Sequence, residues 1–165
     1  MAIIIALSAL AATNSFAQYN EIKSENIASL QVVAGNNWLS MPIATLNGEA
    51  INISFDDLTH EYHRYAYRLQ HCEADWSVSE GIFESDYCEG FADGSTIDDI
   101  EESLNTNTLY THYRLSIPNE NCRIKMSGNY RLTVYDENEG DTVFTACFMV
   151  VEPLLRQESQ TYEIR

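Results

Sequence analysis

Alternation of apolar and polar side chains recurs along this chain and constrains its fold more than any other feature. In residues 51–56, the apolar Ile51, Ile53 and Phe55 alternate with polar neighbours. Because successive side chains of a β-strand point to opposite faces, this pattern predicts a strand with one buried and one exposed face. The same period of two appears in three later segments, residues 64–71, 109–117 and 130–135.

The alternation also predicts which side chains enter the core. In residues 109–117, the side chains expected to point inward are Leu109, Tyr113, Leu115 and Ile117. In residues 130–135 they are Tyr130, Leu132 and Val134. Tyr130 stands at the start of its strand, like the tyrosine of immunoglobulin-like domains whose hydroxyl bonds back to the preceding turn.

Three further strands are predicted from apolar runs between turn signals. Residues 30–34 precede a Gly-Asn-Asn turn, and residues 38–43 form a weaker candidate interrupted by Pro42. Residues 142–151 are apolar on both faces, as in a central strand of a sandwich. About seven strands of this kind predict an all-β chain, an immunoglobulin-like antiparallel β-sandwich with one long acidic crossover.

Composition and charge narrow the class of protein. The chain has 165 residues, of which 45% are hydrophobic, enough for one domain with a buried core. This composition excludes intrinsic disorder, which requires low hydrophobicity together with high charge. The net charge of -16 repels phosphate backbones and anionic membrane surfaces. We therefore expect no nucleic-acid partner and no direct membrane insertion.

Residues 1–17 have the features of a secretory signal peptide. They contain an uncharged apolar run that is shorter than the roughly 20 residues of a membrane-spanning helix. Ser15 and Ala17 are small residues at the two positions that signal peptidase recognises. Cleavage is therefore expected between Ala17 and Gln18, and it would release an exported, soluble chain.

Four cysteines are candidates for disulfides in the oxidising compartment that export implies. They are Cys72, Cys88, Cys122 and Cys147, and the three connectivities that four cysteines allow remain open. Cys72 and Cys88 would close the shortest loop, whereas Cys147 lies in an apolar run and has the alternative role of a small buried side chain. No pair has the Cys-x-x-Cys spacing of zinc or thioredoxin-type sites.

One long segment breaks the strand pattern and is strongly acidic. Residues 73–102, which we term the acidic crossover, contain 11 acidic residues and no basic residue. Connections of this length are uncommon unless they are functional or internally structured. A short helix is expected to start in residues 95–103, because acidic side chains lie near its N-terminus.

Two interpretations of the acidic crossover stay open. It is either a solvated connection pinned to the sandwich by its aromatic residues, or a recognition surface for a basic partner. In the second case, aromatic side chains would anchor the contact and charged residues would surround it. The candidate partner-binding residues are Trp76, Phe83, Tyr87, Phe91, Asp98, Asp99, Glu101 and Glu102.

No motif in the sequence predicts catalysis, a cofactor or a metal site. His60 and His63 would share a metal only on a helix, but their surroundings predict a surface turn. His112 is expected on the polar face of a strand, where a structural role is favoured over that of a catalytic base. Adjacent acids such as Asp56 and Asp57 point to opposite faces of a strand, so they do not form an acid/base pair. We therefore expect a non-enzymatic protein that holds no cofactor and no metal.

Several short motifs together resemble one known family. They are SFDDL at 54–58, YRLQHCEADW at 67–76, ESDYCEGF at 84–91, SLNT at 103–106, LYTHY at 109–113, IPNE at 117–120 and SGNY at 127–130. In this order and spacing they resemble the N-terminal domain of the plug protein of the type IX secretion system of Bacteroidota. The resemblance runs from about Leu30 to Glu152.

The resemblance implies a periplasmic, non-enzymatic subunit associated with the outer membrane. Members of this family close the periplasmic mouth of an outer-membrane translocon barrel, which would be the partner of this chain. They continue into a second, larger part, whereas this chain becomes polar after Pro153. We therefore expect a plug-protein β-sandwich domain over residues 18–153 and a polar tail in residues 154–165. Either the gene is truncated or frameshifted, which would make the tail a remnant, or only one domain is present.

A carbohydrate-binding module is the alternative function. Exposed aromatic side chains on a β-sandwich often stack on sugar rings, and the candidates here are Trp38, Trp76 and Tyr135. A hydrolase ranks last, because the sequence shows no convergent set of catalytic residues.

Overall fold

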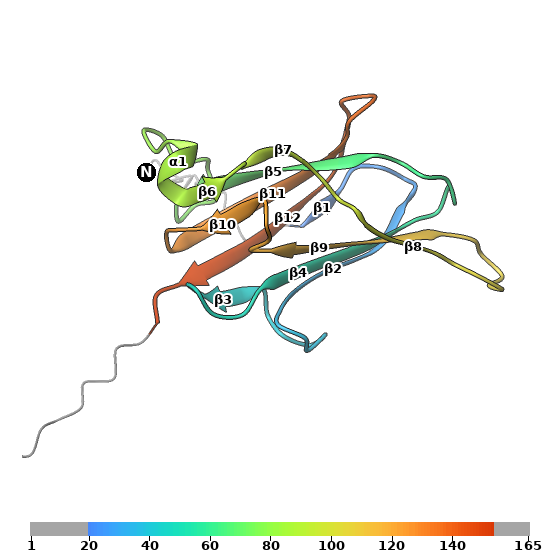
Figure 1. Cartoon of the computed structure of the whole chain (residues 1–165), viewed down its shortest axis with the longest axis horizontal. Helices are drawn as coiled ribbons and strands as arrows, with labels where there is room; N and C mark the ends of the chain where they lie inside the picture. Colours follow the sequence, from blue (N-terminus) through green and yellow to red (C-terminus); the bar gives the residue numbers. More distant parts are fainter. Residues whose placement is uncertain (1–19, 154–165) are drawn as a thin grey trace, which may run out of the picture.

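The structure is a computed structural model that describes residues 20–153, and it is a sandwich of two β-sheets (Figure 1). The strands of the larger sheet are β1 (Glu21–Ile22), β3 (Ile43–Thr45), β5 (Tyr65–Cys72), β7 (Asp93–Thr96), β11 (Gly128–Asp136) and β12 (Thr142–Val151). Their order is β1-β12-β11-β5-β7, and β3 pairs with β12 in parallel.

The smaller sheet packs against the larger one. Its strands are β2 (Ile27–Ala34), β4 (Ile51–Asp57), β8 (Asp99–Glu102) and β9 (Thr111–Ile117), in the order β2-β4-β9-β8. Between the sheets at one end, β6 (Cys88–Gly90) and β10 (Cys122–Ile124) form a separate two-stranded sheet. The helix α1 (Glu84–Tyr87) leads directly into β6.

The strand order confirms the predicted immunoglobulin-like sandwich. The order β2-β4-β9-β8 corresponds to the A-B-E-D sheet of that fold, and β12-β11-β5 corresponds to its G-F-C sheet. The strand-start tyrosine is confirmed as well. The hydroxyl of Tyr130 donates a hydrogen bond of 2.6 Å to the main-chain oxygen of Met126, in the turn before β11.

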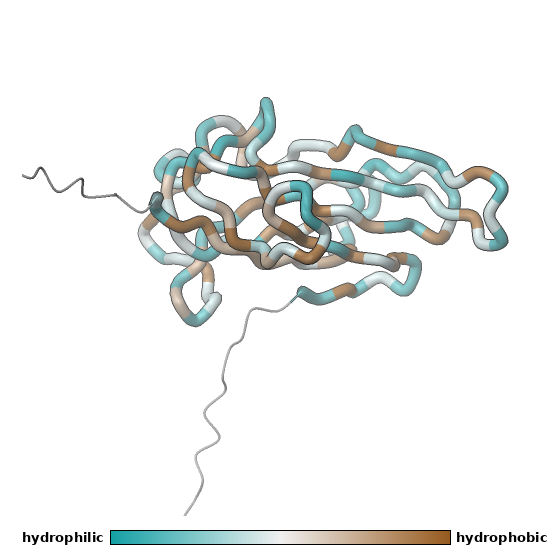
Figure 2. Tube along the Cα trace, turned by 90° about the horizontal axis from the view of Figure 1, so that it is seen from below, coloured by the Kyte–Doolittle hydropathy of each residue, from teal (hydrophilic) through white to brown (hydrophobic). Residues whose placement is uncertain are grey.

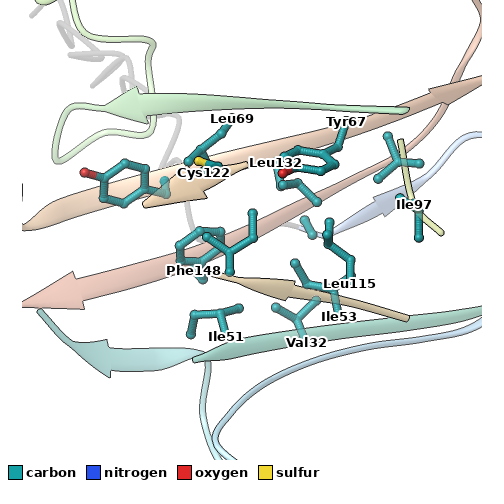
Figure 3. Packing of buried hydrophobic residues seen from close by; sticks show 14 of the residues in the cluster. Val32, Ile51, Ile53, Tyr67, Leu69, Ile97, Leu115, Cys122, Leu132 and Phe148 are labelled. Carbon is teal, nitrogen blue, oxygen red and sulfur yellow. The ribbon is translucent and has the colours of Figure 1, made fainter. Parts of the chain in front are cut away.

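Side chains from the facing surfaces of the two sheets form the core (Figure 3). The smaller sheet contributes Val32, Ile51, Ile53 and Leu115, and the larger sheet contributes Tyr67, Leu69, Leu132 and Phe148. Phe55 and Phe144 meet across the sandwich with ring centroids 4.8 Å apart. Truncating either ring to alanine is expected to cost about 3–5 kcal/mol. Apolar and polar residues alternate along the strands (Figure 2), as half-buried strands require.

The predicted faces agree with the structure except at one position. In β11, Tyr130, Leu132 and Val134 are buried, and Arg131 and Thr133 between them are partly exposed. In β9, Tyr113, Leu115 and Ile117 are buried as expected. Leu109 is instead 48% exposed, because β9 begins only at Thr111 and the alternation does not extend into the preceding loop.

Two predicted elements are wrong. Residues 38–43 are not a strand, because only Ile43 enters β3 and the residues before it form an exposed loop. Residues 95–103 do not start a helix. They pass from β7, which pairs with β5, to β8, which pairs with β9, so the chain crosses from the larger to the smaller sheet. Sheet hydrogen bonds satisfy the backbone there, and Ile97 is buried between the two strands.

The predicted signal peptide, its cleavage between Ala17 and Gln18, and the polar tail at residues 154–165 lie outside the described residues. They stay predictions. Within residues 20–153, no helix is long and apolar enough to cross a membrane.

Candidate interaction surface

The acidic crossover runs from the end of β5 to the end of β8 and passes from the larger to the smaller sheet (Figure 1). It contains α1, β6, β7 and β8, so it is structured along much of its length. Five buried apolar side chains hold it against the sandwich, namely Trp76, Tyr87, Cys88, Ala92 and Ile97. The crossover is therefore held in place before any partner binds.

Trp76 anchors the start of the crossover to the outer surface of the larger sheet. The indole is 9% exposed and packs with Cys72 and Cys147. Its main-chain oxygen accepts a hydrogen bond from the guanidinium of Arg131 in β11. The tight turn that leads to it is closed by a hydrogen bond from the main-chain N–H of Trp76 to the oxygen of Glu73, at 3.0 Å.

Tyr87 anchors the middle of the crossover. Its ring is buried and packs against those of His71 and Tyr130, and its hydroxyl donates a hydrogen bond of 3.0 Å to the main-chain oxygen of Leu69. Burial, together with the nearby charge of Glu84, raises the pKa of Tyr87 to about 12, so the hydroxyl remains a donor at neutral pH. The prediction that the rings of Trp76 and Tyr87 face a partner is corrected, because the sandwich buries both.

Phe83 and Phe91 are the two crossover aromatics that face solvent. Phe83 is 75% exposed just before α1, and Phe91 is 68% exposed just after β6. The main chain is fixed at both positions. The N–H of Phe83 donates to the carboxylate of Asp86, and the N–H of Phe91 donates to the oxygen of Asn121. Two exposed rings on a fixed backbone are suited to anchor a protein contact.

The candidate acids lie on and beside β8, which is an edge strand of the smaller sheet. Asp98, Asp99, Glu101 and Glu102 are all exposed. Arg114 pairs with Asp99 at 3.5 Å and with Glu101 at 2.6 Å, and its hydrogen bond lowers the pKa of Glu101 below the usual value. Within the described residues, Asp98 and Glu102 form no ion pair. The β8 edge therefore keeps a negative charge.

The structure shows a second exposed surface, in a segment that the sequence pattern predicted as a strand. The loop before β3 exposes Trp38, Leu39 and Met41 by 69%, 70% and 69%. The main-chain oxygen of Pro42 accepts a hydrogen bond from Met149 of β12, so this loop lies beside the last strand of the sandwich. Its apolar residues do not alternate, and that irregularity is the signal that could have distinguished it from a strand.

The three aromatics proposed for sugar binding do not form one platform. Trp38 is exposed, but Trp76 is buried. The hydroxyl of Tyr135 donates a 3.0 Å hydrogen bond to Asp93, and the guanidinium of Arg68 covers its ring at 5.8 Å. The structure therefore offers no specific support for a carbohydrate-binding module.

His112 and His63 each lie beside acidic side chains. On the outer face of the smaller sheet, Nδ1 of His112 is hydrogen-bonded to the carboxylate of Asp56, at 2.5 Å. His63 lies between two buried carboxylates, with Nδ1 3.1 Å from Asp136 and Nε2 3.8 Å from Asp57. Among residues 20–153, no group of three or more histidine, cysteine or acidic side chains is arranged to hold a metal ion.

The sequence did not predict the cluster around His63. Asp57 completes it by accepting a 2.8 Å hydrogen bond from the hydroxyl of Tyr65. The available signal was the position of Asp57. It lies two residues after Phe55 and four after Ile53, so it points inward like them in β4. An acid at an inward position predicts a buried partner.

Comparison with known families identifies the chain. The family model for the first domain of the type 9 secretion system plug protein matches residues 27–152. The chain belongs to this family. The matched range agrees with the resemblance seen from about Leu30 to Glu152, and the plug domain coincides with the sandwich described above.

A crystal structure of a hypothetical protein from Parabacteroides merdae is similar to this plug domain. The two are 43% identical in sequence, with a TM-score of 0.78, over 82% of this chain. The matched part is 34% of that protein, so this chain spans about a third of its length. No curated protein matches the chain.

Proposed function

We propose that this chain is a periplasmic, non-enzymatic component of the type IX protein secretion system that helps close the periplasmic mouth of the outer-membrane translocon. The observation that carries the proposal is the plug-domain match over residues 27–152. The fold is compatible with this role, because a rigid sandwich that carries a preformed crossover can present one surface to a large partner.

The acidic crossover is the proposed contact surface for the translocon barrel. Its exposed rings, Phe83 and Phe91, would be buried in the complex, and the acids of β8 would face basic residues of the barrel. The core does not require such a concentration of charge. Eleven acids in residues 73–102 raise self-repulsion, and the ion pairs with Arg68 and Arg114 offset only part of it.

Co-purification with the solubilised translocon barrel tests the proposal. The first variant replaces Asp98, Asp99, Glu101 and Glu102 with serine. Its affinity for the barrel should fall about tenfold at low salt, because each exposed charge is worth a few tenths of a kcal/mol. Raising the salt should weaken wild-type binding more than binding of the variant, since attraction between exposed charges is screened beyond about 8 Å at physiological ionic strength and over shorter distances at higher salt.

A charge-matched control separates this surface from the overall charge. Replacing Glu25, Glu49, Glu61 and Glu120 with serine removes four exposed acids outside the crossover. This control should bind like the wild-type chain. A translocon that does not retain the wild-type chain would contradict the proposed function, whereas equal losses in both variants would contradict only the choice of surface.

The aromatic part of the surface is tested separately. Replacing Phe83 and Phe91 with serine should weaken binding at both low and high salt, because burial of apolar area is not screened. The matched control replaces Tyr62, which is 65% exposed outside the crossover, with serine. Wild-type affinity in the double variant would show that the two rings are not part of the contact.

A further inference from the structure

The structure brings two cysteines together that are 34 residues apart in the sequence. Cys88 in β6 and Cys122 in β10 have Sγ atoms 2.8 Å apart. In the ladder between these strands, Cys88 pairs with Ile124 and Cys122 pairs with Gly90, so the two cysteines are diagonal neighbours. Both are buried, and small rotations of the side chains would bring the sulfurs to bonding distance.

Gly90 allows the two strands to approach this closely. A Cβ atom at this position would overlap with the main-chain oxygen of Asn121, and the φ angle of Gly90 is +105°. Only glycine adopts this conformation readily, and only glycine leaves room for the neighbouring backbone. The close contact between β6 and β10 therefore depends on glycine at position 90.

The remaining cysteines cannot form a bridge with each other. Cys72 pairs with Asn129 of β11, whereas Cys147 pairs with Arg131 on the other side of the same strand. One strand thus separates them, so their backbones are at least about 9 Å apart, beyond the roughly 7 Å that a disulfide spans. They also lie on the outer face of the larger sheet, under Trp76, and not in the core with the first pair.

We propose that Cys88 and Cys122 form a disulfide, the single bridge that this fold allows among its cysteines. Two thiols lose two protons and two electrons as the S–S bond forms. A disulfide oxidant accepts them and becomes a dithiol, either an oxidoreductase of the exporting compartment or oxidised glutathione. The inference rests on the proposed function only for the compartment that supplies this oxidant.

The bridge would stabilise the part of the molecule that carries the candidate contact surface. β6 and β10 are three residues long each and form a sheet of their own, and an isolated pair of strands is only marginally stable in water. Both exposed rings of the crossover, Phe83 and Phe91, lie within five residues of Cys88. A covalent link from Cys88 to Cys122 would hold them in position.

Peptide mapping of the wild-type chain tests the bridge directly. The purified chain is incubated in a buffer of reduced and oxidised glutathione, blocked with N-ethylmaleimide and digested without reduction. Trypsin alone leaves Cys72 and Cys88 in one peptide, because no basic residue lies between Arg68 and Arg114. Adding a glutamate-specific protease separates them, since Glu73 and Glu84 lie between the two cysteines.

The expected product is one cross-linked pair of peptides, residues 85–89 and 121–123, lighter by two hydrogen masses than the separate peptides. Recovery of both peptides with blocked thiols would overturn the proposal. So would a cross-link from Cys122 to Cys72. Neither result would affect the proposed contact with the translocon, which is measured separately.

Thermal unfolding gives a second readout. Dithiothreitol should lower the midpoint of the wild-type chain by about 10 °C, because reduction restores conformational freedom to the unfolded chain. The double variant C88A/C122A should unfold at a lower temperature that does not depend on the reductant. The control C72A should keep the wild-type response. A wild-type midpoint that is insensitive to dithiothreitol would contradict the bridge.

Discussion

Gly128 lies directly against the imidazole of His71. A Cβ atom at position 128 would overlap with Nε2 of His71, and the φ angle of Gly128 is +150°. The ring cannot easily move away. Its Nδ1 is 2.8 Å from the hydroxyl of Ser79, and Tyr130 contacts it edge-on at 5.3 Å. The His-Cys and Ser-Gly-Asn-Tyr motifs of the sequence are thus one packing unit in space.

Replacing Gly128 with alanine should therefore destabilise the domain by about 2 kcal/mol or more, through backbone strain and the overlap with His71. Chemical denaturation measures this change in the free energy of unfolding. In a His71→Ala background the same substitution should cost at least about 1 kcal/mol less, because the overlap is removed. Equal costs in the two backgrounds would show that the contact is not responsible.

Replacing Tyr130 with phenylalanine removes the hydrogen bond to the oxygen of Met126 and preserves the ring. The free energy of unfolding should fall by about 1–2 kcal/mol, because a partly buried carbonyl loses its donor. The matched control is Tyr62→Phe, at a position that is 65% exposed, where the change should stay within about 0.5 kcal/mol. A similar fall in the free energy of unfolding of Tyr62→Phe would show that removing any tyrosine hydroxyl destabilises the domain, and that the bond to Met126 is not the cause.

Stability should fall in acid partly because of Asp136. Burial acts to raise the pKa of Asp136, but hydrogen bonds from the main chain of Asn138 and Glu139 and from His63 together hold it below the usual value. The unfolded chain therefore binds more protons in acid. The stabilisation from Asp136 is present above its unfolded-state pKa of about 3.9 and is lost as the pH falls through the folded-state value.

Urea denaturation between pH 7 and pH 3 measures this dependence. Asp136→Asn should be less stable than the wild-type chain at pH 7, and the difference should shrink towards pH 3. The control is Asp141→Asn, an exposed carboxylate in the same turn, which should follow the wild-type curve. A constant difference at all pH values would indicate that ionisation of Asp136 is not involved.

The two tryptophans should differ in fluorescence, because one is exposed and the other is buried. Trp38 is 69% exposed and Trp76 is 9% exposed. The Trp38→Phe variant should emit at shorter wavelength and resist quenching by iodide. Trp76→Phe should emit at longer wavelength and be quenched readily. Similar quenching of both variants would contradict the packing of Trp76 against Cys72.

The strands that the sequence predicted are those in which a local pattern is sufficient. Alternation places Ile53 and Phe55 in β4 and Leu132 and Val134 in β11, and each pattern is visible within a few residues. The loop around Trp38 was misread as a strand, because a short apolar run without alternation is compatible with either structure. The acidic crossover was recognised as exceptional, but its strands were not. β6 and β7 pair with partners far away in the chain, and β8 is a short strand of exposed acids that pairs with the next strand, β9.

The sequence by itself determined the fold class, the central strands, the family and the unusual charge of residues 73–102. These depend on composition, periodicity and motifs, which are local properties of the chain. Tertiary structure decided the role of each crossover aromatic, because burial depends on which strands become neighbours. It also brought His63 to Asp136, 73 residues away, and Cys88 to Cys122. Contacts of this kind form only when the sheets pair and pack, and no local pattern of residues encodes them.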